Sequence, residues 1–262
     1  MNTARMKILA EEVLILMLYG VDLLSSRSTR KWNQSYEGWL YENGFLRRVH
    51  YLEKQKFLLR EGKRGDWIVK LTQAGRQLAL GGRDAEALWQ RGWDGWWRQI
   101  AFDLPLAQHR TRSTLIRWLR RNGFGYLQDS VWISPNPVTE VSSSLKSVRD
   151  DAESFTILEC RVAPGFNNSS LVSGAWPFKK INNAYVVYQR FADSVERRLR
   201  RERLHPRELF DLLRSERKTW AAAFDLDPLL PMPLWPKNYE GHRTWQIRRE
   251  LLGRFASQMD GR

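Results

Sequence analysis

Residues 92–135, GWDGWWRQIAFDLPLAQHRTRSTLIRWLRRNGFGYLQDSVWISP, decide the fold of this chain. Residues 97–102, WRQIAF, are typical of a buried strand, which ends at an aspartate and a proline that suits the turn into a helix. The helix that follows carries apolar residues on one face and arginines on the other. The pair Asn122 and Gly123 predicts its C-terminal cap, and residues 124–135 predict a further strand or hairpin.

The next two segments complete a small α+β domain. Residues 139–151, TEVSSSLKSVRDD, predict a second helix with Thr139 as its N-cap, and residues 154–163, SFTILECRVA, predict another strand. The resulting order, βαββαβ, is that of a ferredoxin-like domain. We place this central domain at residues 93–170 and expect it to serve dimerisation or to couple an effector to the rest of the chain.

The N-terminal residues 1–82 predict a winged helix-turn-helix. Helical spacing of apolar residues near the N-terminus is followed by a short second helix and then by the basic helix FLRRVHYLEKQKFL, residues 45–58. Two apolar strands, near 57–61 and 66–71, flank a glycine-bounded basic turn, which is typical of a hairpin. Thr72 is the expected N-cap of the helix that follows.

The order of basic helix and basic-tipped hairpin predicts how this module binds DNA. A helix fits the major groove, where side chains reach base edges, and a wing lies along the sugar-phosphate backbone. One face of the helix carries apolar residues, and the opposite face would meet the groove. The predicted DNA-binding residues are Arg47, Arg48, His50, Tyr51 and Lys54 on the helix, and Lys63 and Arg64 on the wing, with Arg48 and the wing residues on phosphates. The alternative is a basic face that is only solvated.

Composition agrees with a polyanion-binding protein. The 262 residues include 43 Lys and Arg against 29 Asp and Glu, which gives a net charge of +14. Such a charge attracts nucleic acid, anionic lipid or phosphorylated ligands, although it can also serve only solubility. The single cysteine, Cys160, excludes an internal disulfide and a cysteine-based zinc site. The apolar run at residues 13–19 is too short to cross a bilayer, so we expect a cytoplasmic protein without membrane contact.

The C-terminal residues 171–262 predict a helical domain. A dense arginine run from Arg197 to Arg203 follows several aromatic residues at helical spacing. This run is either plain surface or a phosphate-binding patch, because arginine recognises phosphate in a forked, bidentate manner. The proline-rich stretch DPLLPMPLWPKNYEGHR, residues 227–243, predicts an ordered segment packed against other parts of the protein.

Three quoted motifs make this chain resemble a known family. Residues 93–135, the segment LVSGAWPFKKINNAYVVYQRF (171–191) and the segment DLDPLLPMPLWPKNYEGHRTWQIRRELLGRF (225–255) resemble the PaaX family, repressors of phenylacetate-type catabolic operons. The resemblance spans nearly the whole chain. It implies a homodimeric transcriptional repressor that binds double-stranded DNA at an inverted repeat. It also implies relief by a small acidic effector such as an aryl-acyl coenzyme A thioester, with no resident cofactor.

The resemblance also raises a rival function. The central domain of the PaaX family is similar to a small ferredoxin-like protein of CRISPR spacer integration, and some of those proteins cut nucleic acid with a strand-end aspartate. Asp103 occupies that place, so a metal-dependent nuclease is one alternative, and a non-catalytic scaffold with nonspecific DNA binding is another. Metal-assisted cleavage needs clustered carboxylates, and no second acid lies nearby in sequence. We therefore expect no enzyme, no catalytic residue and no metal site, with Asp103 capping the helix that starts beyond Pro105 or pairing with an arginine such as Arg112.

Overall fold

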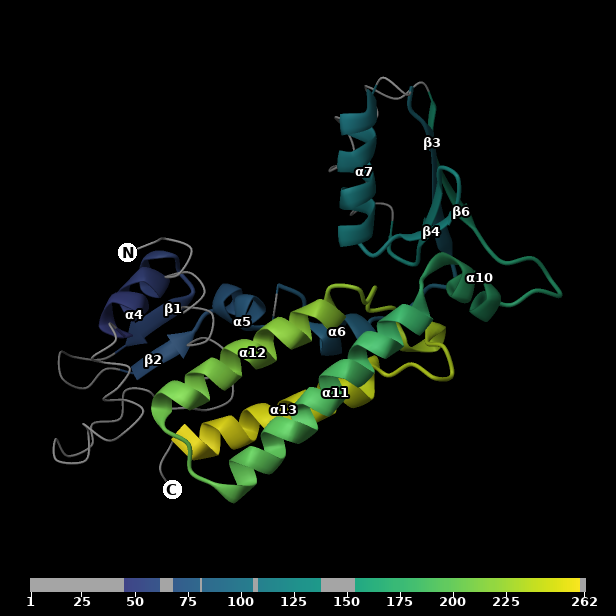
Figure 1. Ribbon diagram of the computed structural model, residues 1–262. Coiled ribbons are helices and arrows are strands. Elements are labelled where there is room, and N and C mark those ends of the chain that lie inside the picture. The colour runs from purple at the N-terminus through teal and green to yellow at the C-terminus, as the bar shows by residue number, and fades with distance from the viewer. Residues whose placement is uncertain (1–44, 62–67, 81, 106–107, 138–153, 260–262) are drawn as a thin grey trace, which may run out of the picture. The chain divides into compact units, whose positions relative to one another are not determined.

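The computed structural model describes residues 45–61, 68–80, 82–105, 108–137 and 154–259 (Figure 1). The chain divides into two compact units. Unit 1 comprises Met1–Asp84, Ala184–Phe224 and Glu240–Arg262, and unit 2 comprises Ala85–Asn183 and Asp225–Tyr239. The described residues form a mixed α and β protein with antiparallel sheets and a helical C-terminal part.

The N-terminal part of unit 1 is a helix, a hairpin and a second helix. Its elements are α4 (Phe45–Lys54), β1 (Leu58–Glu61), β2 (Ile68–Leu71) and α5 (Gln73–Ala79). The two strands pair antiparallel with Leu58 opposite Leu71, which agrees with the predicted hairpin. The earlier helices and the tip of the wing fall in residues 1–44 and 62–67, outside the described residues, so the winged helix-turn-helix stays a prediction.

Close backbone contacts join the hairpin to its flanking helices. Lys56 adopts a left-handed conformation (φ 59°) just after α4, and the Phe57 amide donates back to the Leu52 carbonyl at 2.9 Å. The Thr72 hydroxyl accepts a hydrogen bond from the Gly75 amide at 3.0 Å, which confirms the predicted N-cap. A Cβ at Gly75 would lie 2.0 Å from the Phe57 carbonyl oxygen, so only glycine permits this approach.

Three long helices form the rest of unit 1. They are α12 (Pro206–Phe224), α13 (Gly241–Met259) and the part of α11 (Phe178–Arg201) from Ala184 onward. Their shared core is aromatic: Trp220 stacks on Phe224 at 5.0 Å and lies 5.6 Å from Trp245, with Tyr188 at 5.2 Å. Helical spacing buries one side of each helix, as the sequence predicts.

A buried ion pair lies inside this helical core. Glu216 of α12 is fully buried, and Arg248 of α13 is 2% exposed. The Arg248 Nε donates to Glu216 at 2.7 Å, and the Tyr188 hydroxyl donates to the same carboxylate at 2.8 Å. The Arg248 guanidinium also lies over the Trp220 ring at 4.7 Å. These contacts compensate for the desolvation of both charges.

Unit 2 is built on a four-stranded antiparallel sheet. The strands β3 (Trp97–Asp103), β4 (Gly125–Gln128), β5 (Val131–Ser134) and β6 (Ser154–Cys160) lie in the order β4-β5-β3-β6. Helix α7 (His109–Arg121) connects β3 to β4. These elements agree with the predicted β-α-β-β order and with the predicted last strand. The second predicted helix falls in residues 138–153 and lies outside the described residues.

Helix α7 covers one face of this sheet (Figure 1). Leu115 and Leu119 of α7 are fully buried against Ile100, Phe102 and Trp132 of the strands. The helix ends at Asn122, and the following glycine takes a left-handed φ of 77°, which confirms the predicted cap. The apolar face of α7 is thus fixed to the sheet, and its other face is exposed.

Unit 2 also contains helical elements outside the sheet and α7. They are α6 (Ala85–Gln90), α10 (Asn168–Ala175), the first turns of α11 and the short helix η2 (Met232–Leu234). A Cβ at Gly125 would lie 2.5 Å from the Trp176 ring, so glycine allows Trp176 to pack on β4. Trp89 of α6 donates to the Tyr239 hydroxyl at 3.0 Å, which holds part of the proline-rich segment in this unit, in agreement with its predicted order.

Candidate nucleic-acid interface

The described part of α4 separates an apolar face from a polar one. Val49 and Leu52 are buried at 2% and 0% exposure, whereas Lys54 and His50 are exposed. Tyr51 is half-buried, so its ring packs partly against the protein and only partly faces solvent. The helix therefore presents a mixed basic and aromatic surface, in the arrangement that helical spacing predicts.

The other predicted DNA-binding residues are placed less completely. Arg47 and Arg48 lie within α4, but their side chains are outside the described residues. Lys63 and Arg64 fall between β1 and β2, in residues 62–67, which are also outside them. Helix α4 and the β1–β2 hairpin thus follow one another directly in the chain. The DNA-binding roles of these four residues stay predictions.

Asp103 does not make either of its expected contacts. It is exposed at the end of β3, and the N-cap of α7 is Gln108 with no side-chain cap hydrogen bond. Arg112 instead donates to the Ser130 hydroxyl at 3.3 Å. The expected cap of α7 by Asp103 and the expected pair with Arg112 are therefore wrong, because Gln108 is the N-cap residue and Arg112 bonds to Ser130.

The arginine run at the end of α11 is partly neutralised by acids. Arg198 donates to Glu202 at 2.8 Å and to Glu208 at 2.7 Å. The Glu196 carboxylate accepts from Arg200 at 2.9 Å and from Arg254 of α13 at 2.6 Å. The hydrogen bond from Arg200, followed by that from Arg254, holds the pKa of Glu196 below its usual range. These pairs are those of a surface ion network.

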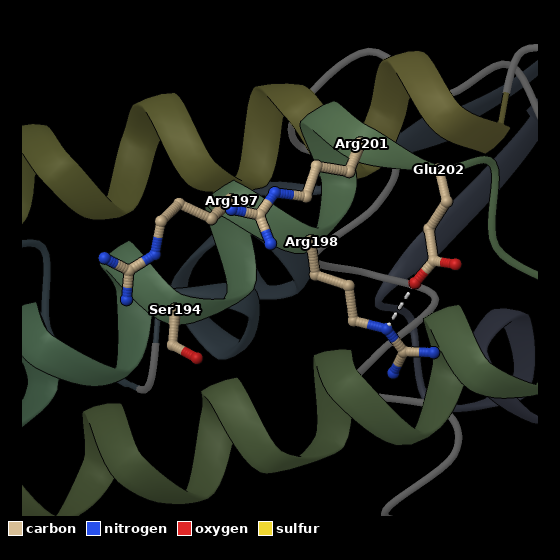
Figure 2. A pocket seen from close by; sticks show the side chains of 5 residues that line it. All are labelled: Ser194, Arg197, Arg198, Arg201 and Glu202. Carbon is tan, nitrogen blue, oxygen red and sulfur yellow. Dashed lines mark hydrogen bonds and ion pairs between the residues drawn. The ribbon is translucent and has the colours of Figure 1, made fainter.

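Three arginines of the run border a hollow of about 620 Å³. Its lining residues all come from α11 or directly follow it: Ser194, Arg197, Arg198, Arg201 and Glu202 (Figure 2). Figure 2 shows Arg197 and Arg198 pointing in opposite directions, with Arg198 held by Glu202. Arg197 and Arg201 make no ion pair with any residue that the structure describes. Two free guanidinium groups beside a hydroxyl can hold an anion such as phosphate.

Two family profiles match most of the described chain. Residues 90–172 match the profile described as PaaX protein central Cas2-like domain, and residues 176–260 match the profile described as PaaX-like protein C-terminal domain. The chain belongs to the PaaX family. It is therefore a transcriptional regulator of the PaaX type, and PaaX regulators as a group bind DNA.

Other comparisons add the fold alone. No curated protein matches this PaaX-family chain. Among solved structures, "Uncharacterized protein Rv0674 from Mycobacterium tuberculosis" is similar with a TM-score of 0.56 and 18% sequence identity. That similarity covers 95% of this chain and 96% of the other. This PaaX-family chain and that protein are therefore similar in fold over nearly their full lengths.

No group of three or more His, Cys, Asp or Glu residues that could hold a metal ion lies among the described residues. Within those residues, no helix combines the length and apolarity needed to span a membrane.

Sequence reasoning did not single out the individual residues of the α11 hollow. Ser194, Arg197 and Arg201 recur at spacings of three and four residues, which places them on one face of a helix. That spacing was readable from the sequence. The acids Glu202 and Glu196 lie four residues from Arg198 and Arg200, but Glu208, which also accepts from Arg198, comes from another helix and was not readable.

Proposed function

We propose that this PaaX-family chain is a sequence-specific, cytoplasmic DNA-binding repressor that reads duplex DNA with α4 and the β1–β2 hairpin. The observation that carries the proposal is the pairing of a helix whose polar face is exposed with an antiparallel hairpin that follows it directly. A helix of this kind fits the major groove, and a hairpin fits along the adjacent backbone.

The proposal assigns different tasks to the two elements. Arg47, His50, Tyr51 and Lys54 face the groove and select the sequence, because base edges carry the sequence information. Arg48, Lys63 and Arg64 hold phosphates and fix the position of the module. The exposure of His50 and Lys54 supports the first assignment.

In a dimer, the remaining parts of the chain set the distance between the two copies of the DNA-binding module, which consists of α4 and the β1–β2 hairpin. A homodimer with two-fold symmetry reads an inverted repeat, because a symmetric protein matches a symmetric site. A small acidic effector such as an aryl-acyl coenzyme A thioester causes release of the DNA under one condition. It must bind more tightly to a dimer conformation in which the two DNA-binding modules no longer match the two halves of the inverted repeat.

The test is an electrophoretic mobility shift on the DNA upstream of the protein's own gene, at fixed salt, with and without acyl-coenzyme A thioesters. We expect a retarded protein–DNA complex that persists when competitor DNA of scrambled sequence is added. The effector should dissociate this complex. Equal affinity for specific and scrambled DNA would contradict a sequence-specific repressor and would favour the scaffold alternative.

Two sets of variants separate the assigned roles. Replacing Lys63 and Arg64 with Ala should weaken binding to all duplexes alike and lower the salt slope by about 0.9 for each lost phosphate contact. Replacing Arg47 or Tyr51 with Ala should instead reduce the preference among sequences. The same loss from both sets would contradict the division of roles.

The chain has no catalytic role in this proposal. Asp103 is exposed at the strand end, and its two neighbours toward the loop, Leu104 and Pro105, bring no metal ligands. The variant Asp103→Ala should therefore bind DNA as the unmodified chain does. Cleavage of a duplex with added Mg²⁺ or Mn²⁺ that this substitution abolishes would establish the nuclease instead.

A further inference from the structure

The outer face of α7 has an unusual charge pattern. The helix, HRTRSTLIRWLRR, carries five arginines and no acidic residue over His109–Arg121. Its inner face is fixed by Leu115 and Leu119, which are fully buried against the sheet. Arg110, Arg117 and Arg121 are exposed on the opposite side of the helix.

The five arginines fall into two groups. Arg112 donates to Ser130, and Arg120 lies over the Trp132 ring at 5.9 Å, so both have contacts with the sheet side of the domain. Arg110, Arg117 and Arg121 are exposed and make no hydrogen bond or ion pair with any residue of the described structure. Three unneutralised guanidinium groups on one helix repel one another, which favours binding of an anion.

The spacing of the three free arginines suits an extended polyanion. Arg110 and Arg117 are about 10.5 Å apart along the helix axis, and Arg117 and Arg121 are about 6 Å apart. Ser113 and Thr114 lie exposed between them and are hydrogen-bonding groups of the kind that contact phosphate. A duplex carries a phosphate about every 3.4 Å along each strand, so a face of this length can meet two or three of them.

The same face does not suit a membrane surface. A helix that lies in a bilayer interface needs large apolar side chains beside its basic residues. The exposed positions of α7 are His109, Arg110, Ser113, Thr114, Arg117, Arg120 and Arg121. No apolar residue is among them, and the leucines of α7 are buried.

We propose that the outer face of α7 binds the DNA backbone independently of sequence, through Arg110, Arg117 and Arg121. This inference rests on the proposed function, because it assumes that the chain is bound to DNA. It adds a second DNA-contact surface, in unit 2, to the one proposed for α4 and the β1–β2 hairpin in unit 1. Charge complementarity and the forked geometry of arginine select phosphate as the group that is bound.

The experiment compares two triple variants of the full chain. In the test variant, Arg110, Arg117 and Arg121 are replaced with Ala. In the matched control, three other exposed arginines without ion pairs to the described residues are replaced with Ala: Arg190, Arg203 and Arg207. Both variants lose the same charge, and the control residues lie outside the α11 hollow. Affinity for a short duplex of scrambled sequence is measured as a function of salt.

The expected result is a selective loss of salt dependence in the test variant. If each arginine holds one phosphate, the salt slope falls by about 2.7, so the ratio of unmodified to variant affinity shrinks about 40-fold between about 50 and 200 mM salt. The control variant should keep the slope of the unmodified chain. Replacing the same three α7 arginines with Lys should also keep it, because the charge remains.

The outcomes separate this inference from the function on which it rests. If the unmodified chain binds no duplex at all, including its own upstream DNA, the proposed function fails. If it binds and both triple variants weaken equally, the effect is one of net charge and the α7 surface is refuted. Thermal unfolding curves of both variants that match the curve of the unmodified chain exclude a folding defect, since substitutions at exposed positions change stability little.

Discussion

Helices α7 and α11 are both rich in arginine, yet their charges are used differently. On α11, Glu196 and the neighbouring acids Glu202 and Glu208 hold Arg198 and Arg200 in ion pairs. On α7 there is no acid, and three arginines have no partner among the described residues. Each helix carries five arginines, so the position of the acids decides how many of these charges are neutralised.

Buried arginines differ from the exposed arginines of α7 and α11. Arg98 of β3 is 5% exposed and donates to Asp94 and Glu159, at 2.9 Å for the Nε contact with Glu159. Asp94, and then Glu159, raise the pKa of Arg98 further above its ordinary value. Arg98 and Arg248 are the two arginines that are buried among the described residues, and each donates to a carboxylate.

The largest effect is expected at the buried pair. Replacing Glu216 with Ala leaves the Arg248 charge in the core without its carboxylate and removes an acceptor from Tyr188. Loss of one partner of a buried pair costs about 3–5 kcal/mol. Urea unfolding followed by tryptophan fluorescence measures this loss, because Trp220 and Trp245 lie beside Arg248.

A matched variant shows whether burial is the reason. Replacing Glu216 with Leu, Arg248 with Met and Tyr188 with Phe removes the whole polar group at once. Most of the lost stability should return, because no buried charge remains. A loss of under about 1 kcal/mol in Glu216→Ala would show that water or other groups solvate Arg248, and it would contradict the comparison.

The next effect separates the two faces of α7. Replacing Leu119 with Ala should lower the stability of unit 2 by about 2–5 kcal/mol, because the side chain is fully buried and leaves a cavity. Replacing Arg117 with Ala should change stability by about 0.5 kcal/mol or less. Thermal unfolding of both variants measures the contrast, and equal losses would show that the arginine face is also structural.

The smallest effect is expected at the α11 surface network. Replacing Glu196 with Gln removes the charge that pairs with Arg200 and Arg254, and surface pairs contribute about 0.2–1 kcal/mol after solvent screening. The same substitution frees two arginines, so DNA binding at low salt should strengthen slightly. Unchanged DNA affinity would show that acids on α11 do not control its availability to phosphate.

The pH dependence of this network has a definite sign. The pKa of Glu196 is lowered below its ordinary value of 4.5, first by the hydrogen bond from Arg200. A lowered folded pKa stabilises the protein above the ordinary value, and the contribution disappears as the pH falls through the lowered one. The difference in stability between the unmodified chain and Glu196→Gln should therefore shrink below about pH 4.5 and be constant near neutrality.

Local patterns predicted much of what the structure shows. The hairpin, the strands at both ends of the central domain, the cap at Thr72 and the left-handed Gly123 all follow from glycines, caps and apolar periodicity within a few residues. The expected contacts of Asp103 were wrong because they depend on how a loop leaves the sheet. The second acid that pairs with Arg198, Glu208, was not predictable, since it lies on another helix.

The sequence by itself determined the order of helices and strands, the polar and apolar faces of α4 and α7, and the PaaX-type motifs. These features depend on neighbours a few positions apart, so periodicity is sufficient. Only the tertiary structure decided which arginines are neutralised, which are buried and which are free. An arginine's state depends on acids and rings that are distant in sequence, as Glu216 shows for Arg248 and Ser130 for Arg112.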